Sequence, residues 1–223
     1  MAGELGWVAL TVGLYVLARR GERGRLRGWG LVATAGALWV ALRLTGTPPV
    51  RYSQALAPVT FLLAPATVAL AVPLVRHWPL LAARGRRMVA AIAVGGLVSS
   101  FSAALLSVGL GLPGLWRTLL PHSATTPIAL PLVAALGGSA ELGAVATVLT
   151  GLIGSLVGPA GLARLGIRDR VAQGVALGTA SSGIGTARAW REAPEMGAAA
   201  GLAMALSGVA IALLCLPFVN GRG

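Results

Sequence analysis

The sequence predicts an all-α, polytopic membrane protein, a helical bundle with about 6–8 membrane segments. Hydrophobic residues make up 56% of the 223 residues and charged residues only 11%, against about 25% charged residues in a soluble domain. A soluble protein of this size could not hide so much apolar surface. Alternating ten-residue segments, which are typical of an outer-membrane barrel, do not occur. We therefore expect residues 1–223 to form a single transmembrane domain.

The net charge of +12 comes entirely from arginine, because the chain has no lysine. The arginines fall in short clusters between apolar runs. Such clusters are typical of cytoplasmic loops beside anionic headgroups, so we expect no nucleic-acid partner. The single cysteine, Cys215, lies in the last apolar run and can form no internal disulfide, so it is expected to be a packing residue.

Residues 1–55 are expected to form an N-terminal two-span region. A first span at 3–18 is followed at once by a cluster of arginines, which places that loop in the cytoplasm. A second span at 28–42 has Trp29 and Trp39 near its ends, where tryptophan commonly anchors a helix at the interface. Because no basic region precedes the first apolar run, the N-terminus is interpreted as a membrane helix rather than a signal peptide.

Residues 56–223 are expected to form the core of the protein. A third span at 56–75 contains three prolines and is followed by a second basic loop. Beyond it, apolar spans alternate with segments that polar residues interrupt. These are predicted as a span at 88–112, a broken segment at 115–136, a span at 140–163, a second broken segment at 171–189 and a span at 196–219.

The first broken segment contains LLPHSATTPIALP (119–131), with three prolines, a histidine and three hydroxyl residues. In a membrane such a break is costly, because each proline removes a backbone donor and the freed carbonyls have no water to bind. It is tolerated only where it is buried in protein or lines a wet cavity. We predict that this break and GTASSGIGTARA (178–189) are the two halves of one substrate site.

The charges leave two topologies open. If every segment crosses fully, the arginines at 164–170 lie outside, against the positive-inside bias. If 115–136 dips in and returns, that loop becomes cytoplasmic, and 171–189 could dip in from the cytoplasmic side. Each broken segment has only about 20 residues, enough for one crossing. Paired re-entrant or broken elements are favoured, and full crossings are the alternative.

A faint internal repeat relates residues 88–136 to residues 140–189. Each unit is a span, a loop and a break rich in serine, threonine and glycine, with SATTPIA (123–129) falling on SSGIGTA (181–187). Repeated units with interrupted helices in corresponding places indicate a transporter site near the bilayer midplane. An inverted arrangement of the two units is expected.

Residues at the two breaks suit a small anion. A broken helix presents unpaired backbone donors and the positive end of a half-helix dipole. Hydroxyls add donors, glycines allow close approach, and Arg188 could bind a carboxylate through its guanidinium group. These features favour a small hydroxy- or keto-carboxylate. The predicted substrate-binding residues are Ser123, Thr125, Thr126, Pro127, Gly178, Thr179, Ser181, Ser182, Gly185, Thr186 and Arg188.

Each of these residues also has a structural interpretation. Arg188 could reach a lipid headgroup. His122 could couple transport to protons or be structural, and Glu141 could carry a proton or cap a helix. Small residues also pack membrane helices closely, and GxxxG spacings occur at Gly154/Gly158, Gly174/Gly178 and Gly197/Gly201.

No sequence motif indicates an enzyme, a cofactor or a metal site. The chain has no HExxH motif, no metal-spaced Cys/His set and no Walker loop. A serine hydrolase that uses Ser181 or Ser182 with His122 is the one enzymatic alternative, and no pattern brings those residues together. We therefore expect a protein without catalytic residues or cofactors.

Four motifs resemble the LrgB/CidB family of bacterial inner-membrane proteins. In chain order they are LLAPATVALAVPL (62–74), LLPHSATTPIALP (119–131), TGLIGSLVGP (150–159) and GVALGTASSGIGTARA (174–189). The resemblance runs from about Tyr52 to the C-terminus. Ser182 stands where the family usually has a histidine, and His122 stands where it usually has lysine or arginine. If the family's histidine moves protons or touches substrate, this chain differs in coupling or ligand.

The resemblance implies a multi-pass protein of the bacterial inner membrane. Family members were named as antiholin-like and holin-like regulators of murein hydrolase export and autolysis, which work with a small LrgA/CidA-like membrane partner. A plastid relative is a glycolate/glycerate transporter, and bacterial relatives are linked to pyruvate uptake. The prediction is a secondary transporter of small monocarboxylates, oligomeric and coupled to H⁺ or Na⁺, with the lysis regulator as the alternative.

Overall fold

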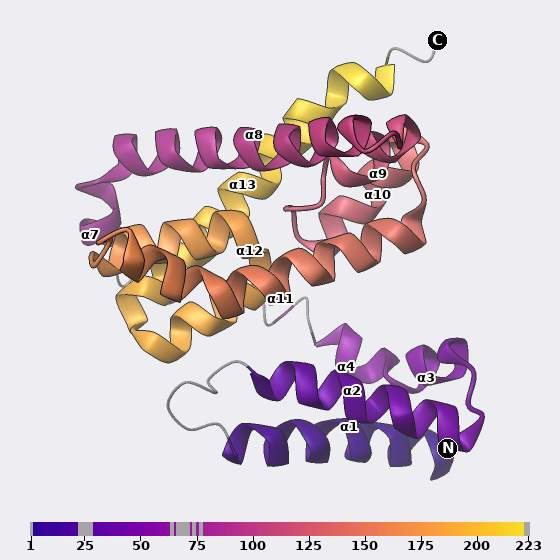
Figure 1. Ribbon diagram of the computed structural model, residues 1–223. Coiled ribbons are helices and arrows are strands. Elements are labelled where there is room, and N and C mark those ends of the chain that lie inside the picture. The colour runs from indigo at the N-terminus through magenta and orange to yellow at the C-terminus, as the bar shows by residue number, and fades with distance from the viewer. Residues whose placement is uncertain are drawn as a thin grey trace. The chain divides into compact units, whose positions relative to one another are not determined.

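A computed structural model describes residues 2–21, 29–62, 65, 72, 75 and 78–220 of the chain (Figure 1). Every regular element within these residues is a helix, so the predicted all-α class is confirmed for them. The chain divides into two compact units, residues 1–71 and residues 72–223. Each unit is described by itself.

The N-terminal unit pairs its first helix with the two that follow. Trp7 packs edge-on against Tyr52, with ring centroids 5.7 Å apart and an interplanar angle of 87°. The Thr11 Oγ1 atom lies 3.1 Å from the hydroxyl oxygen of Tyr52. The helices are α1 (Ala2–Arg20), α2 (Trp29–Thr45), α3 (Pro49–Ala55) and α4 (Ala57–Phe61). The contacts of Tyr52 hold α1 against α3.

A sharp bend of 118° separates α2 from α3. Gly46, just past the end of α2, has a φ of +62°, a conformation that glycine adopts without steric cost. Pro49 then opens α3 at its first position, where the missing N–H group costs no helical hydrogen bond. The predicted second span therefore ends in a turn rather than in a straight helix.

The core unit contains the three longest helices and both broken segments. Its described elements are α7 (Trp78–Ala82), α8 (Gly85–Gly109), the 3₁₀ turn η2 (Pro113–Leu115), α9 (Trp116–Leu119), α10 (Thr126–Leu136), α11 (Ala140–Arg164), α12 (Arg170–Glu192) and α13 (Pro194–Asn220). The predicted span at 56–75 lies largely outside the described residues.

The first broken segment returns to the end of the bundle where it began. The backbone N–H of Ser139, at the start of α11, donates to Thr118 Oγ1 in α9 at 3.1 Å. A Cβ on Gly138 would lie 2.7 Å from the same oxygen. Because the residues on either side of the segment touch, α9 and α10 form the two arms of a hairpin. Its tip is the turn from Leu120 to Thr125.

The second broken segment also returns, from the opposite end of the bundle. Gly174 lies against the Met196 carbonyl and Gly178 against the Ala200 carbonyl, so the first half of α12 runs parallel to the start of α13. Gly185 in the second half lies against the Leu177 carbonyl in the first half. The second half of α12 therefore folds back along the first. In Figure 1 α12 enters the bundle beside α7 and folds back toward the start of α13.

Helix α13 forms the centre of the core unit. Its alanine face, Ala198, Ala199 and Ala203, is buried against α8 and the first arm of α12. Its later residues Ile211 and Cys215 pack against the first hairpin. Small side chains on α13 let the glycines of α12 approach its backbone closely. Both hairpins are thus held on one central helix.

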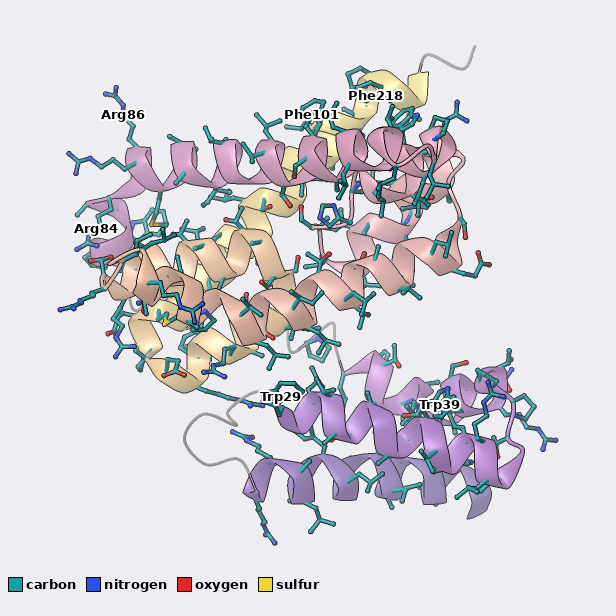
Figure 2. All side chains as sticks on the ribbon, in the orientation of Figure 1. Trp29, Trp39, Arg84, Arg86, Phe101 and Phe218 are labelled. Carbon is teal, nitrogen blue, oxygen red and sulfur yellow. The ribbon has the colours of Figure 1, made fainter. Side chains whose placement is uncertain are left out.

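Large apolar side chains cover the outside of the long helices (Figure 2). Three described helices, α8, α11 and α13, are long and apolar enough to cross a membrane, and the bent pair of α2 and α3 is a fourth candidate. Helix α10 has only 11 residues, a length of about 16 Å, or roughly half of the hydrocarbon core. The predicted total of about 6–8 segments is not confirmed in the residues that the structure describes.

Candidate functional site

The break in α12 lies at Ser182. Its φ of 47° and ψ of −133° interrupt the helix between two regular halves. No other described residue except glycine has a positive φ. This backbone conformation is one that glycine usually occupies, and it costs a side-chain-bearing residue roughly 1–3 kcal/mol. Such strain is retained where the surrounding contacts require it.

The break in the first hairpin lies between α9 and α10. Thr125 is the extended N-cap residue of α10, and its side chain caps no backbone N–H group. Pro127 sits in the first turn, where it needs no backbone donor. The Ile128 N–H donates to the Thr125 carbonyl at 2.8 Å, so Thr126 carries the one N–H among the first three residues of α10 that has no acceptor in the described part of the chain. The positive end of the helix dipole at this N-terminus favours negative charge.

The two breaks touch each other. The Ser182 hydroxyl donates a hydrogen bond of 2.5 Å to the backbone carbonyl of Ser123, across 59 residues of sequence. Both residues are buried. The two segments that the sequence predicts as halves of one site are thus in contact through this bond.

Five buried hydroxyls of the core unit have no hydrogen-bond partner among the described residues. Ser123, Thr179 and Ser181 belong to the two hairpins, Ser100 belongs to α8 and Ser207 to α13. Each is at most 5% exposed. Buried polar groups are normally paired, so five unpaired hydroxyls on four elements mark an interior suited to a small polar ligand.

The other predicted residues at the breaks either pack within the protein or lie nearer its surface. Gly178 and Gly185 are pressed against carbonyl groups of the protein itself, so they serve close packing. Thr186 Oγ1 donates to the Ser182 carbonyl at 2.9 Å, which stabilises the second arm. Thr126 and Pro127 at the start of α10 are only partly buried or exposed.

Arg188 forms an ion pair on its own helix. Its Nε atom lies 3.1 Å and its Nη2 atom 3.0 Å from Glu192 Oε1. The two side chains are only 15% and 22% exposed. The guanidinium charge is thus compensated one turn further along α12. Binding of a carboxylate by Arg188 stays a prediction.

His122, next to Ser123, has a neighbour at each ring nitrogen. Nδ1 lies 2.7 Å from the Leu119 carbonyl, which can only accept, so Nδ1 carries a proton. Nε2 faces the Ser99 hydroxyl of α8 at 3.4 Å. This arrangement fits a structural histidine, and the neutral Nε2 is also the atom at which a proton could be taken up.

Glu141 lies at the beginning of α11, away from both hairpin tips. Its carboxylate accepts a hydrogen bond of 2.8 Å from the Ser139 hydroxyl. Ser139 in turn is the N-cap residue, and its Oγ accepts from the Leu142 N–H at 3.2 Å. The capping interpretation of Glu141 therefore fits the geometry, with Ser139 as the cap itself.

Residues 11–220 match the LrgB-like family. The chain belongs to the LrgB-like family. This match confirms the resemblance drawn from the four motifs, and it covers both hairpins and all three long helices of the core unit.

Similar proteins include YwbG of Bacillus subtilis, which is 34% identical over 190 residues, covering 85% of this chain and 84% of YwbG. A protein of Haemophilus influenzae is 32% identical over 169 residues, covering 75% of this chain and 73% of that protein. Both relatives are described as uncharacterized. No solved structure matches the chain.

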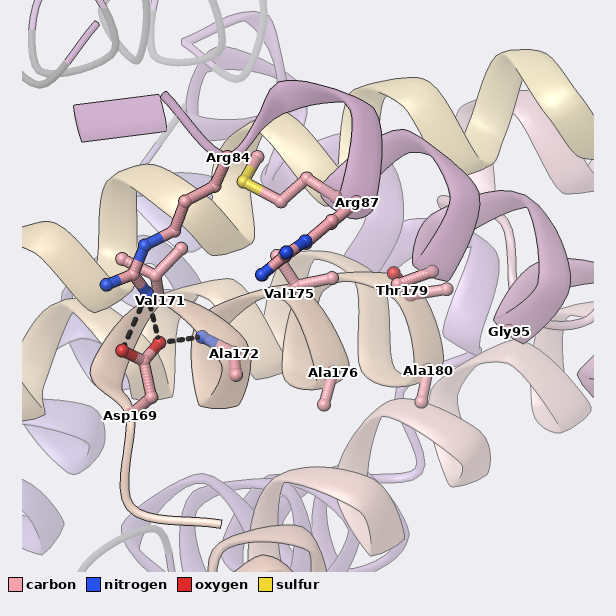
Figure 3. A pocket seen from close by; sticks show the side chains of 12 residues that line it. Arg84, Arg87, Gly95, Asp169, Val171, Ala172, Val175, Ala176, Thr179 and Ala180 are labelled. Carbon is pink, nitrogen blue, oxygen red and sulfur yellow. Dashed lines mark hydrogen bonds and ion pairs between the residues drawn. The ribbon is translucent and has the colours of Figure 1, made fainter. Parts of the chain in front are cut away.

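The structure adds residues to this LrgB-like site that the sequence analysis did not select. Ser99 on α8 contacts His122 beside the first break, and Ser100 on α8 and Ser207 on α13 are buried and unpaired among the described residues. A doublet of serines inside an apolar run is the signal that could have indicated them. A groove between α8 and α12, with Arg84 and Asp169 at its mouth, has no local sequence signal (Figure 3).

Proposed function

We propose that this LrgB-like protein is a secondary transporter of small monocarboxylates across the bacterial inner membrane. The observation that carries the proposal is the hydrogen bond from Ser182 to the Ser123 carbonyl, which joins the tips of two hairpins that come from opposite ends of the bundle. A site between opposed interrupted elements is the usual place for substrate in transporters built from inverted repeats.

The depth of the hairpins supports a site near the midplane. The first arm of α12 runs from Arg170 to the break at Ser182, which is about 18 Å of helix. Helix α10 brings the other tip to a similar depth of about 16 Å. Each tip therefore reaches roughly the middle of a hydrocarbon core that is about 30 Å thick.

The chemistry at the tips favours an anion that carries a hydroxyl or keto group. The start of α10 is uncapped by side chains, so the Thr126 N–H and the helix dipole favour a carboxylate. The unpaired hydroxyls of Ser123 and Thr179 are proposed to bind the second polar group of the substrate, whereas Ser181 Oγ lies against Gly154 of α11. Glycolate, glycerate and pyruvate fit these demands, and they are the substrates that the family resemblance implies.

The rival function is an antiholin-like regulator that assembles through its GxxxG spacings. Gly174 and Gly178 are used within the chain against α13, and Gly154 and Gly158 against α12. These two pairs are therefore not free to form an oligomer, whereas in the third pair Gly197 packs against Trp190 and Gly201 meets no atom within 4 Å. The observation behind the rival is thus weakened for two of its three spacings. The transporter itself is proposed as a homo-oligomer with H⁺ or Na⁺ coupling and a small LrgA/CidA-like partner.

Uptake of radiolabelled glycolate, glycerate and pyruvate into proteoliposomes tests the proposal. We expect saturable uptake of at least one substrate, and a loss of at least tenfold in Ser182→Ala. Thr147→Val is the matched control, because Thr147 is buried on α11 and bonds only the Gly143 carbonyl of its own helix. Failure of folded protein to take up any of the three would contradict the proposal, as would unselective leakage of an encapsulated dye.

A further inference from the structure

A groove of about 740 Å³ runs between α8 and α12 in the core unit. Its outer end is formed by Arg84, Arg87 and Asp169, and its inner end by Gly95 and Thr179. Between them the walls are apolar. Along α12 the groove extends from Val171 to Ala180, about 14 Å of helix. Figure 3 shows the charged residues gathered at one end and Thr179 at the other.

The mouth of the groove is electropositive. Helices α8 and α12 both begin there, with Arg84 and Asp169 as their N-cap residues, so two positive helix ends point the same way. Arg84 pairs with Asp169 at 2.6 Å, so the negative charge of this carboxylate is already compensated. Arg87 has no ion-pair partner within the described part of the chain. The mouth therefore retains a net positive charge.

The inner end of the groove carries an unpaired hydroxyl. Thr179 is only 5% exposed, and its Oγ1 has no hydrogen-bond partner among the described residues. It lies three positions before the strained Ser182 on the same helix. The Thr179 side chain lines the groove, its Cγ2 lies against Gly95 of α8, and its oxygen is buried rather than open to the groove.

We propose that this groove is the access route by which a small organic monoanion reaches the two hairpin tips, with Arg87 as its first contact and Thr179 as the point of transfer. The inference rests on the proposed transport function and deepens it. The volume of about 740 Å³ is several times that of a two- to four-carbon acid, so the anion passes with part of its hydration. The Arg84–Asp169 pair clasps α8 to α12 beside this path.

Neutralising Arg87 tests the route in proteoliposomes. For Arg87→Gln we expect the KM for the transported acid to rise about tenfold with an unchanged maximal rate, because capture is weakened while the site at the tips is intact. Arg86→Gln is the matched control: it removes the same charge from the next position of α8 but lies outside the groove (Figure 2). Equal KM values for the two variants would overturn the route.

A labelling measurement tests the same route without relying on uptake. Ala176 lines the groove, and the single native cysteine, Cys215, is buried. We expect Ala176→Cys to react with an anionic methanethiosulfonate reagent, and millimolar glycolate, glycerate or pyruvate to slow that reaction at least threefold. Wild-type protein should remain unlabelled.

The labelling outcomes distinguish failure of the access route from failure of the transport function. If none of the three acids protects the Ala176→Cys variant but vesicles rich in phosphatidylglycerol do, the groove is a lipid site and the route is wrong. If wild-type protein takes up none of the acids, the transport function fails, and protection of the introduced cysteine by an acid would still support entry into the groove. Uptake without any protection would reject the route alone.

Discussion

Ser182 combines an unfavourable backbone conformation with a favourable long-range bond. Glycine would adopt a φ of 47° without strain, and Gly183 is its immediate neighbour. The break nevertheless falls on the serine, whose hydroxyl reaches the Ser123 carbonyl. The strain is therefore offset by a contact that only a side chain with a donor can make. At this residue the geometry of the site takes precedence over the local backbone preference.

Substitutions at Ser182 should separate strain from bonding. Ser182→Ala keeps the strained backbone and loses the bond, so we expect a loss of about 0.5–1.5 kcal/mol in the free energy of unfolding. Ser182→Gly loses the same bond but relieves the strain, so it should be at least as stable as wild type. Thermal unfolding in detergent, followed by tryptophan fluorescence, gives the order. An alanine variant more stable than the glycine variant would contradict it.

Asp169 should make stability depend on pH. The hydrogen bond from Arg84, and secondarily that from the Ala172 N–H, lowers the pKa of this carboxyl below its usual value. A lowered folded-state pKa means that the stabilisation is complete above the unfolded-state pKa of about 4 and is lost as the pH falls through the lower folded value. Both side chains are 45% exposed, so the effect is small and screened by salt.

The matched variant for this pH effect is Asp169→Asn, which can still cap α12 but carries no charge. We expect wild type to have the higher melting temperature at pH 7 and the difference to shrink steadily below pH 4. The comparison is made at low salt, by thermal unfolding between pH 3 and pH 7. A difference that is constant over this range would show that the charge of Asp169 contributes nothing.

At the scale of elements, close packing between α12 and α13 holds the second hairpin. A Cβ on Gly178 would overlap the Ala200 carbonyl, which is backbone and cannot rotate away. We expect Gly178→Ala to lower the free energy of unfolding by roughly 1–3 kcal/mol or more. Gly201→Ala, which changes the residue directly after Ala200 on α13, meets no atom within 4 Å and serves as the control. Equal melting temperatures for both variants would contradict this packing.

The long helices were predictable because composition and length suffice for them. The predicted spans at 88–112, 140–163 and 196–219 correspond to α8, α11 and α13 with small shifts at their ends. Prolines and hydroxyl residues also indicated where the hairpins break. The choice of Ser182 over Gly183 depends on a carbonyl 59 residues away, and the pairing of Arg84 with Asp169 spans 85 residues. Local patterns contain neither partner.

At the scale of the whole core unit, the return of both broken segments favours the topology in which they do not cross fully. The ion pair between Arg84 and Asp169 places the start of α8 and the loop before α12 at the same end. Since α8 and α11 both run the length of the bundle, the segment between them must turn back. The arginines around residues 84–87 and 164–170 then share one side, as the positive-inside bias requires.

Cysteine labelling in intact cells tests this topology. Arg168→Cys should be protected from a membrane-impermeant maleimide, because we predict that its loop is cytoplasmic, whereas Leu112→Cys at the opposite end should be labelled. Leu112 is 53% exposed, and permeabilised cells should label both positions. Labelling of Arg168→Cys from outside, with Leu112→Cys protected, would reverse the orientation. Equal labelling of both in intact cells would reject the re-entrant arrangement.

The central claim is that the meeting point of the two hairpins binds a small monocarboxylate. Its most direct measurement is an experimental density map of the protein in lipid nanodiscs with millimolar glycolate, compared with a map without it. We expect added density within hydrogen-bond distance of Ser182, Thr179 and the start of α10. Density for glycolate at another place in a protein that transports it, with the hairpin tips unchanged, would contradict the claim.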